Sequence, residues 1–180
     1  MKTYPSIHTQ AVVLKRSNVG EKDRVVTLFT EKQGKIVSIA KGCRDLHSSR
    51  LSTLEPGNLV DIYLIPTKSM PILTQVQLVN DFIQTKSSLK KMKQLLQVLE
   101  IVDSLSVEDQ NQEVFTRFAS ILHALNTTHL FEGIKEELSL LVEEFGFQHV
   151  QDTEYHTVGE YVSSLSDKPM HSYDFLTIKE

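Results

Sequence analysis

The pattern of apolar and polar positions along the chain changes its period near residue 80. Before that point, short stretches rich in β-branched residues lie between turn residues, which is typical of strands. We predict strands over residues 9–15, 24–30, 34–40, 59–65 and 72–79, with no helical period among them. Beyond residue 80, apolar residues recur at spacings of three and four, which predicts helices over 85–106, 109–125 and 130–145 and a weaker one over 154–165.

Turn residues and one long apolar stripe refine this picture. Proline sets φ and glycine tolerates positive φ, so Glu55-Pro56-Gly57 is a strong turn signal. Further turns are expected at residues 18–20, 33–34 and 66–71, and Gly146 is expected to end the helix over 130–145. The predicted buried stripe of the first long helix consists of Leu89, Met92, Leu95, Leu96, Leu99, Val102 and Leu105.

Five short antiparallel strands predict a small closed barrel, because closure removes the edges that an isolated sheet exposes. The strand count and the basic charge of this region favour a barrel of the OB type. An SH3-like barrel and an open sheet packed on the helices are the alternatives. The fold class is therefore α+β: an N-terminal five-stranded OB-type β-barrel, residues 1–80, followed by an all-α helical domain, residues 81–180.

The charge of the chain is divided as unevenly as its secondary structure. Over its 180 residues the formal net charge is −4. Residues 1–80 carry 11 Lys and Arg against 6 Asp and Glu, a net charge of +5, whereas residues 81–180 carry 8 against 17, a net charge of −9. Such asymmetry suggests two modules with different partners, and a basic module favours a polyanion. The alternative is that both surfaces simply face solvent.

Several classes of protein are excluded by what the chain lacks. It has no apolar run long enough to cross a bilayer and no apolar segment near Met1 to act as a secretion signal, so we expect a soluble cytoplasmic protein without a membrane partner. Its one cysteine, Cys43, excludes an internal disulfide and a multi-cysteine zinc site. Its histidines have no metal-ligand spacing. We expect no metal and no cofactor.

No constellation of residues indicates an enzyme. The chain has no phosphate-binding Gly-Lys-Ser/Thr loop, no nucleophile elbow and no zinc-binding His-Glu-x-x-His helix. Glu21 and Asp23 flank Lys22 and are candidates for a metal or acid–base pair. The favoured interpretation is that they cap the turn and pair with Lys22 or Arg24.

Two segments carry a family resemblance. The first is Ala11–Thr30, with its Gly20-Glu21-Lys22-Asp23 turn and its final Leu28-Phe29-Thr30; the second is Gly34–Arg44, which ends Ala40-Lys41-Gly42-Cys43-Arg44 and is followed by Ser49. Together they resemble the opening of the RecO recombination-mediator family.

The resemblance implies an OB barrel followed by a helical domain. It also implies binding of single- and double-stranded DNA, annealing of complementary strands and recombinase loading in DNA repair. The implied partners are RecR and the acidic C-terminal tail of single-stranded DNA-binding protein. The chain is shorter than is usual for the family at its C-terminal end, and it lacks the zinc-binding cysteines that some members carry.

The candidate DNA-binding residues cluster around the first three strands and the loop that follows them. Cationic side chains there would contact phosphates, and Gly42 would allow the backbone to approach one. The candidates are Lys15, Arg16, Lys22, Arg24, Lys35, Lys41, Arg44 and Arg50, and the alternative is a solvated basic face. Candidate base-stacking residues are Tyr4, His8, Phe29, His47 and Tyr63, although Phe29 fits the core better.

Two further features concern single residues and the helical half. Cys43, beside Lys41 and Arg44, is interpreted as a small loop side chain, with a lowered thiol pKa as the alternative. At the start of the apolar stripe, Lys90, Lys91 and Lys93 would form the basic rim of a site for an acidic peptide that ends in an apolar residue. Alternatively, the stripe packs on the barrel.

For the function of the whole chain, the alternative is a protein-interaction adaptor that keeps the barrel but does not bind DNA.

Overall fold

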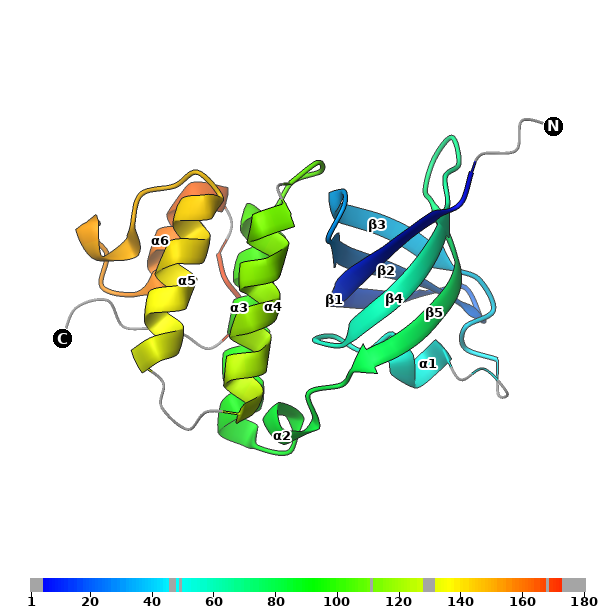
Figure 1. Ribbon diagram of the computed structural model, residues 1–180, viewed down its shortest axis with the longest axis horizontal. Coiled ribbons are helices and arrows are strands. Elements are labelled where there is room, and N and C mark those ends of the chain that lie inside the picture. Colours follow the sequence, from blue (N-terminus) through cyan, green and yellow to red (C-terminus); the bar gives the residue numbers. More distant parts are fainter. Residues whose placement is uncertain are drawn as a thin grey trace. The chain divides into compact units, whose positions relative to one another are not determined.

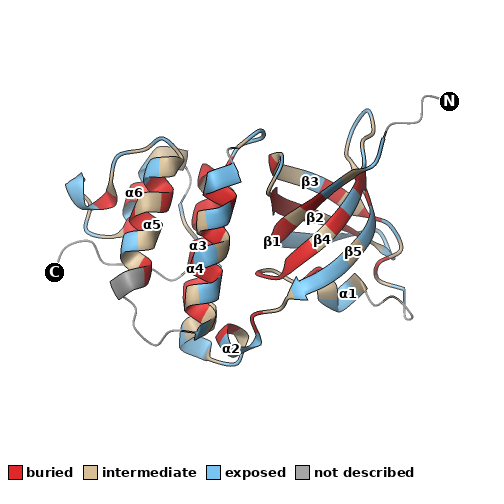
Figure 2. Ribbon diagram, viewed as in Figure 1, coloured by how far each residue is buried: buried red, intermediate tan, exposed pale blue. Residues whose placement is uncertain are grey.

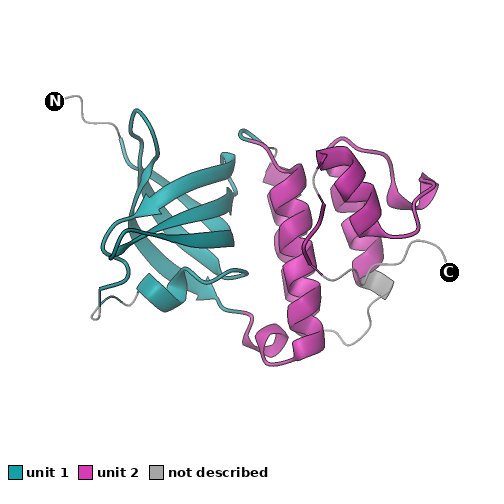
Figure 3. Cartoon of the chain, turned by 180° about the vertical axis from the view of Figure 1, so that it is seen from behind, with its two compact units in different colours: residues 1–81, 108–111 teal, residues 82–107, 112–180 magenta. Residues whose placement is uncertain are grey.

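The computed structural model describes residues 5–45, 48, 50–110, 112–127, 132–167 and 169–172. It divides into two compact units, one of residues 1–81 and 108–111 and the other of residues 82–107 and 112–180 (Figure 3). The segment 108–111 belongs to the first unit, where Glu108 forms an antiparallel bridge with Gly34. The Asp109 N–H also donates to the Gln33 carbonyl oxygen at 2.9 Å.

The first unit is a closed barrel of five strands, β1 (Ile7–Val19), β2 (Asp23–Thr30), β3 (Gly34–Ala40), β4 (Leu59–Ile65) and β5 (Ile72–Asn80) (Figure 1). The strands close in the order β1-β2-β3-β5-β4. All pairs are antiparallel except β3 with β5, where Ile39 lies beside Ile72. The predicted barrel followed by helices is confirmed. The bounds of β3 and β4 match the prediction, and β2 and β5 each gain one residue.

The first strand is longer than predicted because it serves two neighbours. Residues 7–12 pair with β4, and residues 11–19 pair with β2, with an irregularity between Val13 and Lys15. Beyond that irregularity β1 and β2 form a hairpin in which β1 is exposed at residues 15–19. An exposed strand carries no apolar alternation, so the sequence pattern stops at Lys15.

The barrel core takes every second residue along β1, β2 and β4. Figure 2 shows the buried positions of the strands in red. Its buried residues include Val13, Val26, Leu28 and Ile62. Cys43 belongs to this core and is fully buried. Burial raises the pKa of its thiol and outweighs the opposing effect of nearby arginines, so the lowered thiol pKa is excluded.

The second unit contains five α-helices among its described residues: α2 (Ile83–Lys86), α3 (Leu89–Leu105), α4 (Gln112–Thr127), α5 (Glu132–Glu144) and α6 (Val158–Ser166), with a short 3-10 helix, η1 (Val150–Asp152). The helix predicted over 85–106 is therefore divided. The Ser88 side chain accepts the Lys91 N–H and caps a new helix. The weak helix predicted from residue 154 begins instead after Thr157, which forms a capping box with Glu160.

The helix predicted over 109–125 also begins later, because Asp109 lies in the bridged segment of the first unit. The predicted stop at Gly146 is confirmed by its φ of +93°, which glycine adopts without a steric penalty.

The buried face of α3 is rotated relative to the prediction. Leu89 and Leu96 are 74% and 47% exposed, whereas Gln94 and Gln97 are buried. The reason is that α3 contacts α2, α4 and α6, so that it is covered on more than one side. Four residues of the predicted stripe are buried: Leu95, Leu99, Val102 and Leu105.

Candidate nucleic-acid interface

One end of the barrel joins the β1–β2 turn, residues 20–22, to the loop after β3, residues 41–45. Arg44 makes two of the links: its N–H donates to the Lys22 carbonyl oxygen at 3.0 Å, and its Nη1 donates to the Gly20 carbonyl oxygen at 3.1 Å. The third link is the Asp23 carboxylate, which accepts the Gly42 N–H at 2.8 Å. We call this part of the surface the barrel rim.

The predicted pairing of Asp23 with Lys22 or Arg24 is wrong, since Asp23 accepts a backbone N–H instead. Lys22 pairs with Asp45, and its Nζ lies 3.1 Å from Asp45 Oδ1. The closed barrel brings the 41–45 loop beside the turn, and this contact cannot be anticipated from the local order of charges.

A one-turn helix, α1 (Arg50–Thr53), lies where the sequence predicts only a loop. Arg50 begins this helix and donates through Nη2 to the Lys41 carbonyl oxygen at 3.0 Å. Among the described residues, neither Arg44 nor Arg50 pairs with a carboxylate: both guanidiniums use neutral carbonyl oxygens. Neither guanidinium is therefore neutralised by a direct ion pair, although the rim also holds the Asp23 and Asp45 carboxylates. The exposed Lys41 lies in the same loop.

The barrel rim opens onto a shallow hollow of about 540 Å³. Arg50 and Gly42 line it from the rim, and Thr74 and Gln75 line it from β5. Of the candidate cations, Arg50 lines the hollow, together with the Asp45 carboxylate and polar side chains of a strand that contributed no candidate in the sequence.

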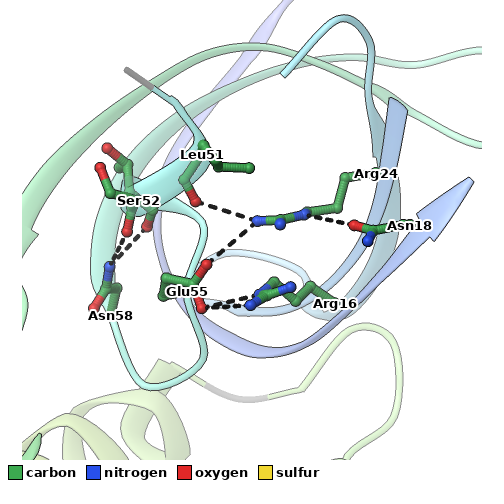
Figure 4. Close-up of polar contacts among 8 residues, drawn as sticks. Arg16, Asn18, Arg24, Leu51, Ser52, Glu55 and Asn58 are labelled. Atoms are coloured by element: carbon green, nitrogen blue, oxygen red, sulfur yellow. Dashed lines mark hydrogen bonds and ion pairs between the residues drawn. The ribbon is translucent and has the colours of Figure 1, made fainter. Parts of the chain in front are cut away.

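Arg24 occupies a different position from the other candidates, because it is only 4% exposed. It precedes Val26 by two positions on β2 and so shares the inward side of the strand. Its Nη1 donates to the Leu51 carbonyl oxygen at 3.2 Å, and its Nε donates to Asn18 Oδ1 at 3.4 Å (Figure 4). Arg24 therefore ties α1 to the barrel, and its burial makes it the least accessible to DNA of the predicted contact residues for which the structure gives an exposure.

Arg16 faces the same side as Arg24, because it pairs with Val26 in the sheet register. Its Nη2 and Nε lie 2.8 and 3.0 Å from Glu55 Oε2. The other carboxylate oxygen of Glu55 lies 3.5 Å from Arg24 Nη1 (Figure 4). The sequence indicates Glu55 only as part of a turn. Its contacts with Arg16 and Arg24 cannot be inferred from the sequence.

The segment from α1 into β4 is held by backbone acceptors. Asn58 Nδ2 donates to the carbonyl oxygens of Ser52 and Thr53, at 3.1 and 2.9 Å, and so closes the end of α1. The Gly57 N–H donates to the Val13 carbonyl oxygen at 2.8 Å. These contacts place Glu55 between Arg16 and Arg24.

The remaining two basic candidates of the barrel lie on its outer surface. Lys15 pairs with Thr27, and Lys35 pairs with Phe29, so neither shares the inward side of Val26 and Leu28. A strand rises about 3.3 Å per residue, which puts Lys35 about 20 Å along the chain from Lys41. The structure thus gathers Lys22, Lys41, Arg44 and Arg50 at the rim and leaves Lys35 away from them.

The stacking candidates separate into core and surface. Phe29 is fully buried, as the favoured interpretation predicted. His8 and Tyr63 stack on each other on neighbouring strands, with ring centroids 4.6 Å apart, and both side chains are exposed. Tyr4, His47 and Ser49 lie outside the described residues.

The three lysines proposed for partner binding lie on α3 in the second unit. Lys90 and Lys93 are exposed and close in sequence to the exposed Leu89 and Leu96. Lys91 instead donates through Nζ to the Asn126 carbonyl oxygen at 3.4 Å.

The described residues contain neither a cluster of metal ligands nor a membrane-spanning helix. No group of three or more His, Cys, Asp or Glu side chains is placed there to hold a metal ion. None of the helices within the described ranges is both long and apolar enough to cross a membrane.

The closed five-stranded barrel, with β3 parallel to β5 and a helix between β3 and β4, defines the first unit as an OB-fold domain. In this class, the strand 2–3 face and the loops between strands 1 and 2 and between strands 4 and 5 bind oligonucleotides and oligosaccharides. The cationic barrel rim includes the first of these loops.

Comparison with known proteins agrees with this class. A family model described as "Recombination protein O N terminal" matches residues 1–82. The relatives include "DNA repair protein RecO" of Salinibacter ruber, 32% identical over 129 residues, which are 71% of this chain and 49% of that protein. The proteins of the same name from Alkaliphilus metalliredigens and Clostridium perfringens are 30% and 29% identical, over 74% and 83% of this chain and 52% and 58% of theirs.

Over residues 1–82 the chain is similar to the N-terminal part of the RecO family of DNA repair proteins, and the curated relatives carry the same family name. The resemblance inferred from its sequence is confirmed. The chain spans about half the length of the curated relatives that it matches.

Proposed function

We propose that this chain binds single- and double-stranded DNA at the barrel rim, and that it promotes strand annealing and recombinase loading without catalysing a reaction. One observation carries the proposal. Arg44 and Arg50 are held at the rim by neutral carbonyl oxygens, so the fold positions their guanidiniums without neutralising them. Lys41, shortly before them in the chain, is exposed.

The proposed chemistry is electrostatic. A cation that neutralises a phosphate releases condensed counterions, so affinity falls steeply with salt and depends little on sequence. Two strands that are neutralised in this way repel each other less, and annealing then needs no catalytic residue. We place Lys22, Lys41, Arg44 and Arg50 in the primary contact surface, with Lys15 and Lys35 on its outer extension.

The test is a fluorescence-anisotropy titration of labelled single- and double-stranded oligonucleotides at several salt concentrations. We expect the triple variant Lys41→Gln, Arg44→Gln, Arg50→Gln to bind about tenfold or more weakly at low salt. For single strands, its plot of log affinity against log salt should be shallower by about 2.

The matched control is Lys90→Gln, Lys91→Gln, Lys93→Gln, which removes the same charge from α3. This control should leave DNA affinity nearly unchanged. An equal loss in both triple variants would show that net charge alone attracts DNA and would contradict a site at the rim.

For the second unit we propose a protein-binding role on the exposed part of α3. Exposed Leu89 and Leu96 beside Lys90 and Lys93 suit an acidic peptide with an apolar end, such as the C-terminal tail of single-stranded DNA-binding protein. A RecR-like protein is proposed as a partner on the family resemblance alone. Binding of a labelled acidic tail peptide should weaken in Leu89→Ser, Leu96→Ser and in the lysine triple variant, but not in the rim triple variant.

The second candidate function is an adaptor that keeps the barrel without binding DNA. It is favoured by the net charge of −9 over residues 81–180, which would repel DNA. Peptide or RecR binding by a chain that does not bind oligonucleotides even at low salt would establish the adaptor.

A further inference from the structure

Glu55 lies between two arginines that differ in their freedom to leave it (Figure 4). Arg24 is buried and also donates to the Leu51 carbonyl oxygen and to Asn18 Oδ1. Within the described residues, the Arg16 guanidinium contacts Glu55 Oε2 through Nη2 at 2.8 Å and through Nε at 3.0 Å. Arg24 is thus fixed by several acceptors, whereas Arg16 depends on Glu55.

The pair of Arg16 with Glu55 is also open to solvent. The two side chains are 32% and 36% exposed. Ion pairs at this exposure contribute little to stability, because water screens them and their side chains lose conformational freedom. Arg16 can therefore exchange the Glu55 carboxylate for another anion at small cost. Glu55 cannot follow Arg16 far, since Arg24 and the chain around Gly57 hold it.

Arg16 belongs to the same end of the barrel as the rim cations. It lies on β1 shortly before the β1–β2 turn, and Glu55 lies just after α1, which begins at Arg50. A phosphate bound at the rim would therefore be within the same group of loops as the Arg16–Glu55 pair.

We propose that Glu55 competes intramolecularly with DNA phosphate for Arg16. The inference rests on the proposed DNA binding at the rim. In the free protein Glu55 holds Arg16 and lowers the effective charge of the surface by one. When a phosphate backbone binds, Arg16 exchanges one oxyanion for another. Glu55 thereby limits the affinity for DNA, and it is a positioning residue that acts through Arg16.

The test is a double-mutant cycle on single-stranded DNA affinity, with the full chain and its Glu55→Gln, Arg16→Gln and double variants. Glutamine keeps an oxygen to accept from Arg24 but removes the charge. We expect Glu55→Gln to bind about threefold to tenfold more tightly at low salt and to steepen the salt plot by about 0.7, the contribution of one added phosphate contact. In the Arg16→Gln background the same change should have little effect.

Glu21→Gln is the matched control, because it removes an equal charge from an exposed residue of the nearby β1–β2 turn. Its effect should be the same with and without Arg16. If Glu55→Gln behaves like Glu21→Gln in both backgrounds, the competition is refuted and the proposed function stands. If the unmodified chain does not bind DNA at low salt, the proposed function fails, and this inference fails with it.

A second comparison does not require any change at Glu55. Arg44 donates to a carbonyl oxygen, so its charge is already available, whereas Arg16 must first leave a carboxylate. Arg16→Gln should therefore weaken DNA binding severalfold less than Arg44→Gln. An equal loss in these two single variants would overturn the inference even if Glu55→Gln did not fold.

Discussion

Each unit of this protein uses an arginine to join separate segments, but the two guanidiniums meet different acceptors. In the barrel, Arg24 donates to a backbone carbonyl and an amide oxygen, and one oxygen of Glu55 lies at 3.5 Å. In the helical unit, Arg117 donates to Glu144 Oε1 at 2.7 Å and to Glu137 Oε2 at 2.8 Å. The first arginine relies mainly on neutral oxygens, and the second relies on two carboxylates.

The difference concerns how far each arginine's charge is neutralised by its partners. Arg117 is more than neutralised by its partners, and the hydrogen bond from its Nε to Glu144 raises the pKa of its guanidinium above the ordinary value. At the barrel rim, Arg44 and Arg50 follow the pattern of Arg24 and donate to carbonyls. A fold that binds its arginines through carbonyls keeps their charge available for an external anion.

The largest effect is expected when the buried arginine of the barrel is removed. Arg24→Met leaves the Leu51 carbonyl and Asn18 Oδ1 without this donor and leaves Glu55 with Arg16 alone, and we expect the barrel to lose about 2–4 kcal/mol. Cys43 is the chain's one cysteine and is buried in the barrel core, so its reaction with a thiol reagent reports opening of this unit. Its labelling should be faster by about 30-fold to 1000-fold, at 1.4 kcal/mol per factor of ten.

The control for this measurement is Arg117→Met, which alters the helical unit. It should leave the labelling rate of Cys43 unchanged. If both variants accelerated the labelling of Cys43 equally, the two units would unfold together. The separate contributions of Arg24 and Arg117 to their own units would then be refuted.

A smaller effect is expected from Arg117→Met on its own unit. The variant leaves Glu137 and Glu144 near each other without a cation, but all three side chains are partly exposed and solvent screens the repulsion. We expect a loss of about 1–2 kcal/mol, seen as faster amide hydrogen exchange in α4 and α5. A loss as large as that of Arg24→Met would show that burial does not decide how much these two arginines contribute to stability.

The smallest effect concerns Glu100 on α3, whose carboxylate accepts the backbone N–H groups of His171 and Ser172, both at 2.7 Å. Burial opposes ionisation of this carboxyl, but the hydrogen bonds from Ser172 and His171 outweigh it and lower its pKa below 4.5. A lowered pKa in the folded state stabilises the fold at neutral pH. This stabilisation is lost as the pH falls through that lowered pKa.

The measurement is amide hydrogen exchange at His171 and Ser172 as a function of pH. Protection should decrease on acidification, because protonated Glu100 holds these N–H groups less strongly, by about 1 kcal/mol. Glu100→Gln should have low protection throughout and little pH dependence. Protection that stays constant from neutral to acidic pH would contradict this role of Glu100.

The regular elements of the barrel could be predicted almost residue by residue. The alternation in β3 and β4 marks both strands, because an inward-facing side chain every second residue is a local requirement of any half-buried strand. The outer half of β1 was missed for the complementary reason: residues 15–19 are exposed and need no apolar pattern. On α3, the same logic placed Leu89 and Leu96 in the core, because periodicity does not reveal how many neighbours cover a helix.

The candidate site could be predicted only in part. The cluster of cations around the first strands was visible in the sequence, but which of them reach solvent was not. Arg24 could have been placed inward from its spacing to Val26. Glu55 could not, because its partners Arg24 and Arg16 lie 31 and 39 residues away.

The succession of strands and helices, the uneven charge and the family resemblance follow from the amino-acid sequence, since they depend on local periodicity, composition and motifs. The tertiary structure alone decided which oxygen each guanidinium meets. Closure of the barrel brings the β1–β2 turn, the loop after β3 and α1 to one end, and a charge is neutralised or left available only by what lies within hydrogen-bond distance of it there.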